Sequence, residues 1–191
     1  DRIGYVRVNS TLGSSIISIA PDPFALDEQT LVAVGSAFSL SRVTVAPTGD
    51  RIAYSSDKDG TDDLYSVSVS GGSSVRLTNS AQNEFALYWS KDGEALASAY
   101  GGASSDEVGV VPADGSGSFQ AITNDSFDDS FGDWSPDGDS LAYVKNFGSS
   151  DFGAPVIFVA DVSAGGDSVV QLFEQQGTGY NVSGVHWRPS P

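Results

Sequence analysis

One sequence motif recurs along this chain at intervals of 44 to 53 residues, and it constrains the fold more than any other feature. Its clearest copy reads Trp-Ser-Pro-Asp-Gly from Trp134 and is followed at once by Asp-Ser-Leu-Ala-Tyr. Proline fixes φ, aspartate accepts hydrogen bonds from the nearby backbone and glycine tolerates positive φ, so Pro-Asp-Gly predicts a tight turn between two strands. Related copies occur at Trp89 and, with valine in place of tryptophan, at Val45.

A fourth copy is divided between the two ends of the chain. Residues 187–191 (Trp-Arg-Pro-Ser-Pro) supply its first part and residues 1–5 (Asp-Arg-Ile-Gly-Tyr) its second, and the two parts align without a gap. We therefore expect the ends to meet in space, with residues 181–187 forming a strand beside the N-terminal one. Such a join would hide the sheet edges that an open arrangement exposes.

Each repeat predicts four short strands. The expected strands are 3–8, 16–19 and 29–34 in the first unit, 41–46, 51–55, 64–69 and 74–78 in the second, 85–90, 95–100, 107–111 and 118–123 in the third, and 131–135, 140–145, 156–160 and 168–173 in the fourth. No segment shows a sustained 3.6-residue apolar period, so helices are not expected to carry the structure.

The second strand of each unit alternates a large residue with a very small one, at Gly4, Ala53, Ala97 and Ala142. One face of each strand is therefore nearly bare, which lets the bulky face of a neighbouring sheet approach. This pattern predicts an all-β fold, a four-bladed β-propeller of four-stranded antiparallel blades whose first blade is closed by the C-terminal strand. A single domain would span 1–191, with repeats at about 41–79, 80–124, 125–174, and 175–191 plus 1–40.

The repeat resembles that of a known family. The tryptophan and its turn, the Asp-Lys-Asp-Gly loop at 57–60, the Leu-Tyr-Ser-Val strand from Leu64, the Gly-Gly turn and the Arg-Leu-Thr strand from Arg76 are similar to the TolB-type β-propeller repeat. That family includes periplasmic and extracellular interaction domains and the propellers attached to prolyl-oligopeptidase-like hydrolases. The resemblance implies an extracellular or periplasmic location. TolB-type rings usually have six or more blades, whereas four repeats occur here.

The charge and amino-acid composition of the chain limit the kinds of partner that it can bind. With 25 acidic against 9 basic residues the net charge is −16, which repels nucleic acid and favours cations or basic partners. No apolar run approaches the roughly 18 residues that a membrane helix needs, so no membrane insertion is expected. The chain has no cysteine, which excludes disulfides and thiolate metal sites.

The sequence does not predict an enzyme. No Gly-x-Ser-x-Gly nucleophile motif occurs, and the one histidine, His186, has no identifiable nucleophile and is expected to be a packing residue. Acidic residues are plentiful, but a catalytic carboxylate pair needs a defined separation and a pocket. The sequence shows neither.

Two acidic clusters are candidates for binding Ca²⁺, which prefers several oxygen ligands. The candidate ligands are Asp57, Asp59, Asp62 and Asp63 in one cluster, and Asp125, Asp128 and Asp129 in the other. The first cluster also has an ordinary alternative, as the usual turn of this repeat. Both clusters fall in loops that join the second strand to the third, or the fourth to the next repeat.

The fourth unit carries extra length between its second and third strands. Phe147, Asp151 and Phe152 in this stretch are candidate partner-binding residues, because loops that depart from a scaffold often carry recognition. The alternative is a tolerated insertion whose phenylalanines cover the end of the ring. Sequons at Asn9, Asn124 and Asn181 are candidate glycosylation sites.

The leading hypothesis from sequence is a non-enzymatic, exported propeller that serves as an interaction or assembly module for a protein partner or for copies of itself. Two alternatives remain open. The chain could be a propeller domain cut from a larger prolyl-oligopeptidase-like hydrolase, or a repeating subunit of an extracellular filament or surface array.

Overall fold

The computed structural model describes residues 3–9, 13–19, 28–85, 87–101, 105–146, 156–162, 169–173 and 185–187. Within these ranges the chain forms strands and no helix, so none that could cross a membrane. The strands pair antiparallel in four separate sheets. The all-β, antiparallel class predicted from the sequence is confirmed.

The four sheets follow one another along the chain. The first contains β1 (Ile3–Asn9), β2 (Gly13–Ile19) and β3 (Glu28–Ala33). The second contains β4 (Leu40–Val45), β5 (Arg51–Ser56), β6 (Asp63–Ser68) and β7 (Val75–Arg76). The third contains β8 (Asn83–Glu84), β9 (Tyr88–Trp89), β10 (Ala95–Gly101), β11 (Asp106–Pro112) and β12 (Gln120–Ala121). The fourth contains β13 (Asp128–Trp134), β14 (Ser140–Asn146), β15 (Val156–Asp161) and β16 (Val169–Phe173).

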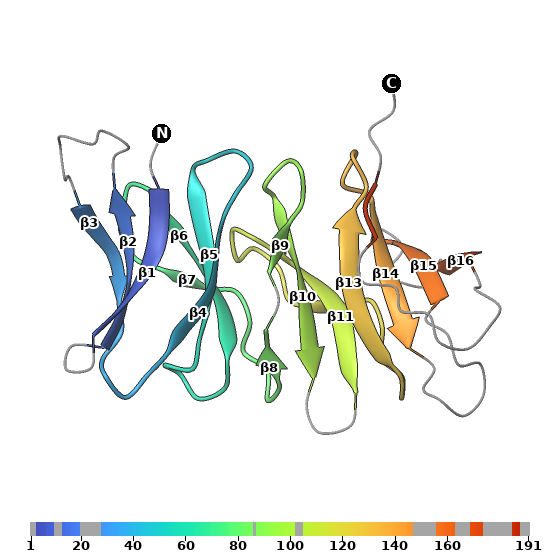
Figure 1. The fold of residues 1–191 in the computed structure, drawn as a ribbon, viewed down its shortest axis with the longest axis horizontal. Coiled ribbons are helices and arrows are strands. Elements are labelled where there is room, and N and C mark those ends of the chain that lie inside the picture. The colour runs from blue at the N-terminus through green and yellow to red at the C-terminus, as the bar shows by residue number, and fades with distance from the viewer. Residues whose placement is uncertain are drawn as a thin grey trace.

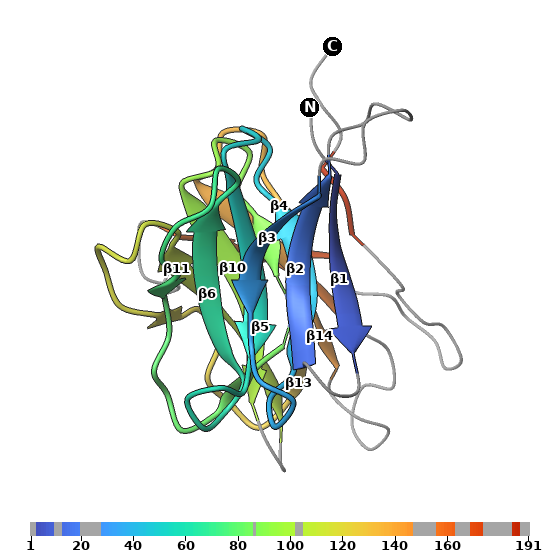
Figure 2. The same ribbon diagram turned by 90° about the vertical axis from the view of Figure 1, so that its left-hand side faces the viewer.

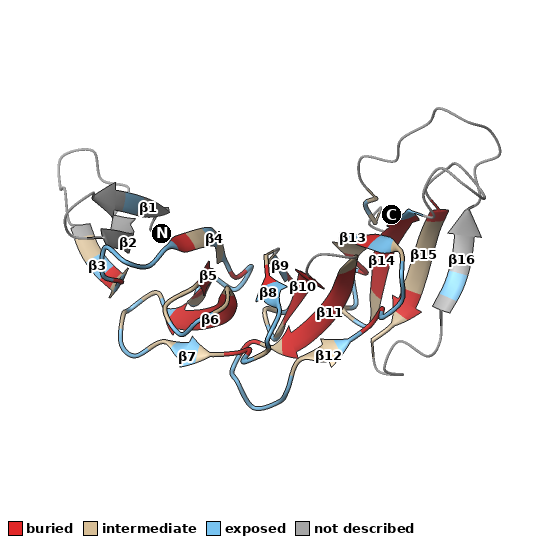
Figure 3. Ribbon diagram, turned by 90° about the horizontal axis from the view of Figure 1, so that it is seen from below, coloured by how far each residue is buried: buried red, intermediate tan, exposed pale blue. Residues whose placement is uncertain are grey.

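The sheets stand side by side in chain order (Figure 1). Seen along that row, successive sheets lie one behind another (Figure 2). From below they form an arc, with β4, β9 and β13 on its concave side and β7 and β12 on its convex side, and the buried residues concentrate in the middle strands (Figure 3). Each sheet is therefore covered by a neighbour on its broad face, as in a propeller.

The predicted turns recur in three consecutive sheets. Gly49, Gly93 and Gly138 have φ of 76°, 76° and 82°, a left-handed conformation that glycine adopts without strain. Each glycine N–H donates to a carbonyl three residues earlier, at 2.8 to 3.0 Å. The Asp-Gly and Thr-Gly pairs thus set equivalent hairpins, as the sequence predicts. The first strand of the third sheet differs from prediction because it is broken into β8 and β9, which pair separately with β10.

Three apolar cores lie between consecutive sheets rather than within one. Ala97 and Val108 of the third sheet pack with Leu141, Tyr143 and Trp134 of the fourth. The small residue of the second strand is fully covered in this arrangement, since the exposed fraction of Ala97 is 0%. The alternation of large and very small residues read from the sequence is therefore what allows the sheets to stack.

Each tryptophan of the repeat makes the same bond to the preceding sheet. The indole N–H of Trp89 donates to Thr44 O (3.4 Å), and that of Trp134 donates to Tyr88 O (3.0 Å). The acceptor is in each case the carbonyl just before the equivalent position of the preceding repeat.

Trp187 makes this bond a third time, to Asp133 O at 3.2 Å, and its backbone N–H donates to Asp133 Oδ2 at 3.1 Å. Gly132 lies beneath this segment, where an added Cβ would come within 2.9 Å of Val185 Cβ, so only glycine allows the approach. Residues 185–187 therefore take the place of the first strand of a further repeat, next to β13 (Figure 1). The prediction that Trp187 is equivalent to Trp89 and Trp134 is therefore confirmed by its contact with the fourth sheet.

The other side of the predicted join is not confirmed. Among the described strands β1 pairs with β2 alone, and the first sheet packs on β4, at the opposite end of the row from residues 185–187 (Figure 1). In the described part of the chain the first sheet has three strands rather than the predicted four. A strand that closed the ring would lie between the fourth sheet and β1. Residues 185–187 contact the fourth sheet but not β1.

The packing between sheets predicts the effect of enlarging a small residue. Ala97→Leu should lower the free energy of unfolding by about 1 to 3 kcal/mol, because the added atoms have no space between the third and fourth sheets. Ala121→Leu on the exposed surface of β12 is the matched control and should change stability by less than about 0.5 kcal/mol. Urea denaturation followed by circular dichroism measures both. Equal effects at the two positions would contradict the inter-sheet core.

Candidate functional site

The loop that joins β5 to β6 and the loop that joins β12 to β13 lie at the lower end of the molecule in Figure 1. Both predicted acidic clusters lie in these loops or at the start of the strand that follows. The predicted partner-binding residues Phe147, Asp151 and Phe152 lie outside the described residues, as does the sequon at Asn181. Asn9 ends β1, and Asn124 is exposed before β13.

The carboxylates of the first acidic cluster, at residues 57, 59, 62 and 63, do not point toward a common centre. Asp57 Oδ1 accepts a hydrogen bond from Ser39 N at 2.6 Å. Asp59 accepts one from the Tyr65 hydroxyl at 2.7 Å and forms an ion pair with Lys58. These two carboxylates are directed to different partners, as in an ordinary turn.

The other two acids of this cluster are also separate. Asp63 is fully buried at the start of β6 and pairs with Arg76 Nη2 at 2.5 Å. Burial raises the pKa of Asp62, and the nearby Asp57 carboxylate acts in the same direction. The structure therefore places these four aspartates without assembling them around one point.

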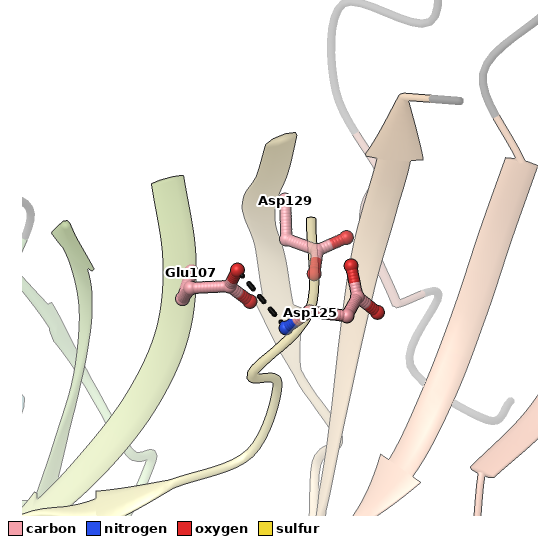
Figure 4. A group of neighbouring side chains, drawn as sticks. All are labelled: Glu107, Asp125 and Asp129. Atoms are coloured by element: carbon pink, nitrogen blue, oxygen red, sulfur yellow. Dashed lines mark hydrogen bonds between the residues drawn. The ribbon is translucent and has the colours of Figure 1, made fainter. Parts of the chain in front are cut away.

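A second group does converge, between the third and fourth sheets. Ligand atoms of Glu107, Asp125 and Asp129 all lie within 4.8 Å of one another, and no other such acidic or histidine group of three occurs in the described parts of the chain. Their carboxylates point toward one another in Figure 4. The dashed line there marks the hydrogen bond from Asp125 N to Glu107 Oε1, 3.1 Å long.

Three different elements position these groups. Glu107 is on β11, Asp129 is on β13, and Asp125 is in the loop that leads into β13. Asp128 was predicted to belong to this cluster but is directed elsewhere, because its Oδ1 accepts the Asp106 N–H at 3.1 Å. The structure thus retains two of the predicted residues and adds Glu107.

Glu107 was missed because it precedes the cluster by many residues and comes from another sheet. One signal in the sequence could have identified it. Asp63 is the first residue of β6 and Glu107 is the second residue of the equivalent strand β11. Each is followed by an acid in the first strand of the next sheet, Glu84 in β8 and Asp129 in β13. The acidic pair is a feature of two consecutive repeats.

Two of the three acids are buried and short of hydrogen-bond donors, whereas the Asp125 side chain is 40% exposed. The exposed fractions of Glu107 and Asp129 are 4% and 2%. By distance and angle, Glu107 Oε2 and both Asp129 carboxylate oxygens have no hydrogen-bond partner among the described residues, although the Thr123 hydroxyl is close enough to lower the pKa of Asp129. Among the described residues the cation paired with this group is Lys145, which pairs with Asp125 and lies 3.6 Å from Asp129 Oδ2.

Burial raises the pKa of Asp129 to about 7, with the Lys145 ammonium acting in the opposite direction. Buried carboxylates without donors bind a proton more tightly than exposed ones, because the charged form loses its hydration. In the absence of another cation, Asp129 is therefore near its midpoint of titration at neutral pH.

A separate cleft of about 460 Å³ opens at the opposite end of the sheets, between the second and third. Turns that join first to second strands, and third to fourth, form its walls. Its charged lining residues are Asp50, Arg51, Asp92, Glu94 and Asp114. Four carboxylates therefore face this cleft with one guanidinium, and sequence reasoning did not single out the site.

His186 is exposed rather than packed. The exposed fraction of its side chain is 81%, and its Nδ1 lies 3.7 Å from Asp133 Oδ2. The expectation of a packing residue is therefore wrong, because the segment's contact with β13 is made through its neighbours Val185 and Trp187.

The sequence matches no protein-family model and no curated protein. Its fold is nevertheless shared with solved structures. TolB from Acinetobacter baumannii superposes with a TM-score of 0.62 at 23% identity, over 90% of this chain and 41% of that one. A putative TolB from Agrobacterium tumefaciens gives 0.60 at 20% identity, over 90% and 60% of the two chains.

Peptidases that carry a similar structure also match. Dipeptidyl peptidase 4 from Porphyromonas gingivalis gives a TM-score of 0.70 at 16% identity, over 91% of this chain and 24% of that one. These likenesses show a TolB-like β-propeller fold, as the sequence resemblance predicts. The chain spans two fifths to three fifths of the length of the two TolB proteins.

The raised pKa of Asp129 predicts how stability depends on pH. Between about pH 4 and pH 7 the folded state binds a proton at this position that the unfolded state has lost, so the contribution of Asp129 to stability falls as pH rises. Relative to wild type, Asp129→Asn should gain up to about 1.4 kcal/mol per pH unit across that window. Urea denaturation with a chelator present measures this difference. Parallel pH profiles for the two proteins would contradict it.

Proposed function

We propose that this chain is a propeller segment of an exported, non-catalytic protein that binds a basic stretch of a protein partner. The observation that carries the proposal is the acidic cleft between the second and third sheets. Propeller folds present clefts of this kind at the ends of their sheets, where loops vary without disturbing the core. The extracellular or periplasmic location rests on the TolB-type resemblance.

The cleft carboxylates are held in their charged form. The Thr48 hydroxyl donates to Asp50 Oδ1 at 2.5 Å and lowers the pKa of that aspartate. The Ser90 hydroxyl donates to Asp92 Oδ1 at 2.6 Å and lowers its pKa in the same way. Hydrogen bonds from the side chain and backbone of Ser116 lower the pKa of Asp114. These groups therefore stay ionised well below neutral pH.

The one cation in the cleft is already engaged. Arg51 Nη1 donates to the Ala113 carbonyl at 2.7 Å, which fixes the guanidinium against the third sheet. Glu94 is exposed at the rim, next to the turn that contains Asp92. A lysine or arginine side chain of a partner would meet uncompensated negative charge there, which favours both its approach and its retention.

Phe147, Asp151 and Phe152, which lie outside the described residues, remain a second candidate contact from the sequence. Aromatic side chains suit an interface core, whereas the cleft suits a charged rim. The two surfaces would bind different partners or different parts of one.

Two alternative functions have their own support. A propeller domain of a larger hydrolase is favoured by the matches to peptidases, including prolyl endopeptidases at a TM-score of 0.65, 12% identity and coverage of 92% of this chain and 28% of the other. A filament or array subunit is favoured by residues 185–187, which begin a further repeat beside β13. Pairing that segment with β1 within one chain would give the closed four-bladed ring. The same pairing between copies would give an array.

The cleft predicts a charge-dependent binding site. Glu94→Lys should weaken binding of a fluorescent octalysine peptide by about tenfold at physiological ionic strength, since it places a cation in the cleft. Asp139→Lys is the matched control because Asp139 follows the turn of the next repeat, is exposed, and is not part of the cleft lining. Fluorescence anisotropy measures both affinities. Equal losses would mean that the peptide responds to net charge alone and would sink the assignment of the cleft.

A further inference from the structure

Two consecutive junctions between sheets carry a buried acidic pair at the same place. Between the second and third sheets the pair is Asp63 and Glu84, both fully buried. Between the third and fourth it is Glu107 and Asp129, with exposed fractions of 4% and 2%. Because the junctions are repeats of one another, the first serves as an internal reference for the second.

In the first junction the protein supplies the donors. Arg76 Nη2 pairs with Asp63 Oδ2 at 2.5 Å. The Thr78 hydroxyl donates to Glu84 Oε2 at 2.9 Å and the Ser80 hydroxyl to Glu84 Oε1 at 2.5 Å. Both oxygens of the buried glutamate are therefore satisfied, and the aspartate has its own guanidinium.

In the second junction two of these three donors are replaced, and the third is kept as Thr123, which lowers the pKa of Asp129 as a donor. Ala121 stands in the position of Arg76, so the guanidinium is lost. Asp125 stands in the position of Ser80, so a hydroxyl donor becomes a third carboxylate. The consequence is visible in Oε2 of Glu107 and both oxygens of Asp129, which by distance and angle have no hydrogen-bond partner among the described residues. Buried acceptors without donors are costly unless another group satisfies them.

The remaining charge is not balanced by the protein. Lys145 contributes one ammonium, which pairs with Asp125 and lies 3.6 Å from Asp129. With all three acids ionised, three carboxylates and one ammonium leave an excess of two negative charges at a point where two of the three acids are buried. A divalent cation would neutralise that excess, whereas a second protein cation is not present among the described residues.

We propose that Glu107, Asp125 and Asp129 form a binding site for a divalent cation, with Ca²⁺ as the ion that fits. All potential ligands are carboxylate oxygens, the type that Ca²⁺ prefers, and they come from three elements that meet at the junction (Figure 4). This site differs from the sequence prediction by including Glu107 and leaving out Asp128.

The chemistry of the group favours Ca²⁺ over Mg²⁺. Two oxygens bound to one Ca²⁺ at about 2.3 to 2.6 Å lie at most about 5 Å apart, and the ligand atoms here lie within 4.8 Å of one another. Mg²⁺ requires near-ideal octahedral geometry and gives up its waters reluctantly, whereas Ca²⁺ accepts a flexible set of carboxylate oxygens.

The Lys145 ammonium pairs with two of the carboxylates that would bind the cation, Asp125 and Asp129. Its ammonium lies 5.9 Å from the Phe127 ring and 5.8 Å from the Phe158 ring, so it approaches the group over aromatic surface. Cation binding must displace the ammonium from Asp125. Lys145 is therefore a competitor for this site and not a ligand.

The test is isothermal titration of the purified chain, stripped with chelator, with CaCl₂ and separately with MgCl₂ at constant ionic strength. The wild type is expected to bind one Ca²⁺ with a Kd of about 10⁻⁵ to 10⁻³ M and to bind Mg²⁺ at least about tenfold more weakly. Ca²⁺ should also raise Tm, because it binds only the folded arrangement. Absence of Ca²⁺ binding, or equal affinity for Mg²⁺, would overturn the proposal.

Matched variants separate a built site from general attraction to an acidic protein. Asp125→Asn and Glu107→Gln should each weaken Ca²⁺ binding at least about tenfold. Asp139→Asn removes the same charge from an exposed position at the other end of the sheets and should change the Kd by less than about twofold, because salt screens distant charges. Equal weakening by Asp139→Asn and Asp125→Asn would overturn the proposal in favour of diffuse counterion binding.

A gain of affinity provides an independent check. Lys145→Met removes the competing ammonium and should tighten Ca²⁺ binding by about tenfold or more, since one like charge near the ion is lost. Circular dichroism in chelator verifies that each variant is folded before titration. A folded Lys145→Met protein that binds Ca²⁺ no more tightly than the wild type would contradict the assignment of this carboxylate group.

Discussion

The hydrogen bond from each repeat's tryptophan to the backbone of the preceding sheet is the interaction on which the arrangement depends. It occurs at Trp89, Trp134 and Trp187 with the same donor atom and an equivalent acceptor carbonyl. A single such bond contributes only about 1 kcal/mol net, but it fixes how far one sheet is displaced along the next. With that displacement fixed, Ala97 faces the bulky side chains of the fourth sheet, and the acids of the two junctions that flank the third sheet meet.

Much of this architecture could be predicted because its causes are local. The glycines at 49, 93 and 138 need a positive φ that few other residues tolerate, and the alternation around Ala53 and Ala97 needs a neighbouring sheet. Pattern alone therefore located the strands, the turns and the faces that pack. The break between β8 and β9 was not predicted, since nothing in the apolar pattern of that segment distinguishes it from the unbroken β13.

The functional surfaces were predictable only in part. Asp125 and Asp129 are close in sequence and could be grouped by eye, whereas Glu107 joins them only because the third and fourth sheets stack. The cleft at Asp50 and Glu94 likewise depends on turns of two different sheets. Closure presented the same difficulty. The repeat pattern showed that Trp187 is equivalent to Trp89 and Trp134. Whether β1 or another strand pairs with residues 185–187 depends instead on the curvature of the whole row of sheets.

The most direct test of the stacking is an NMR measurement of the three indole N–H groups in a chain that contains only three tryptophans. Trp89, Trp134 and Trp187 each donate to a backbone carbonyl, so all three Hε1 resonances should be shifted from their free values and protected from exchange with solvent water. Assignment by substituting each tryptophan with phenylalanine would identify them. A Trp187 resonance at its free shift, exchanging without protection while the other two are protected, would contradict the account.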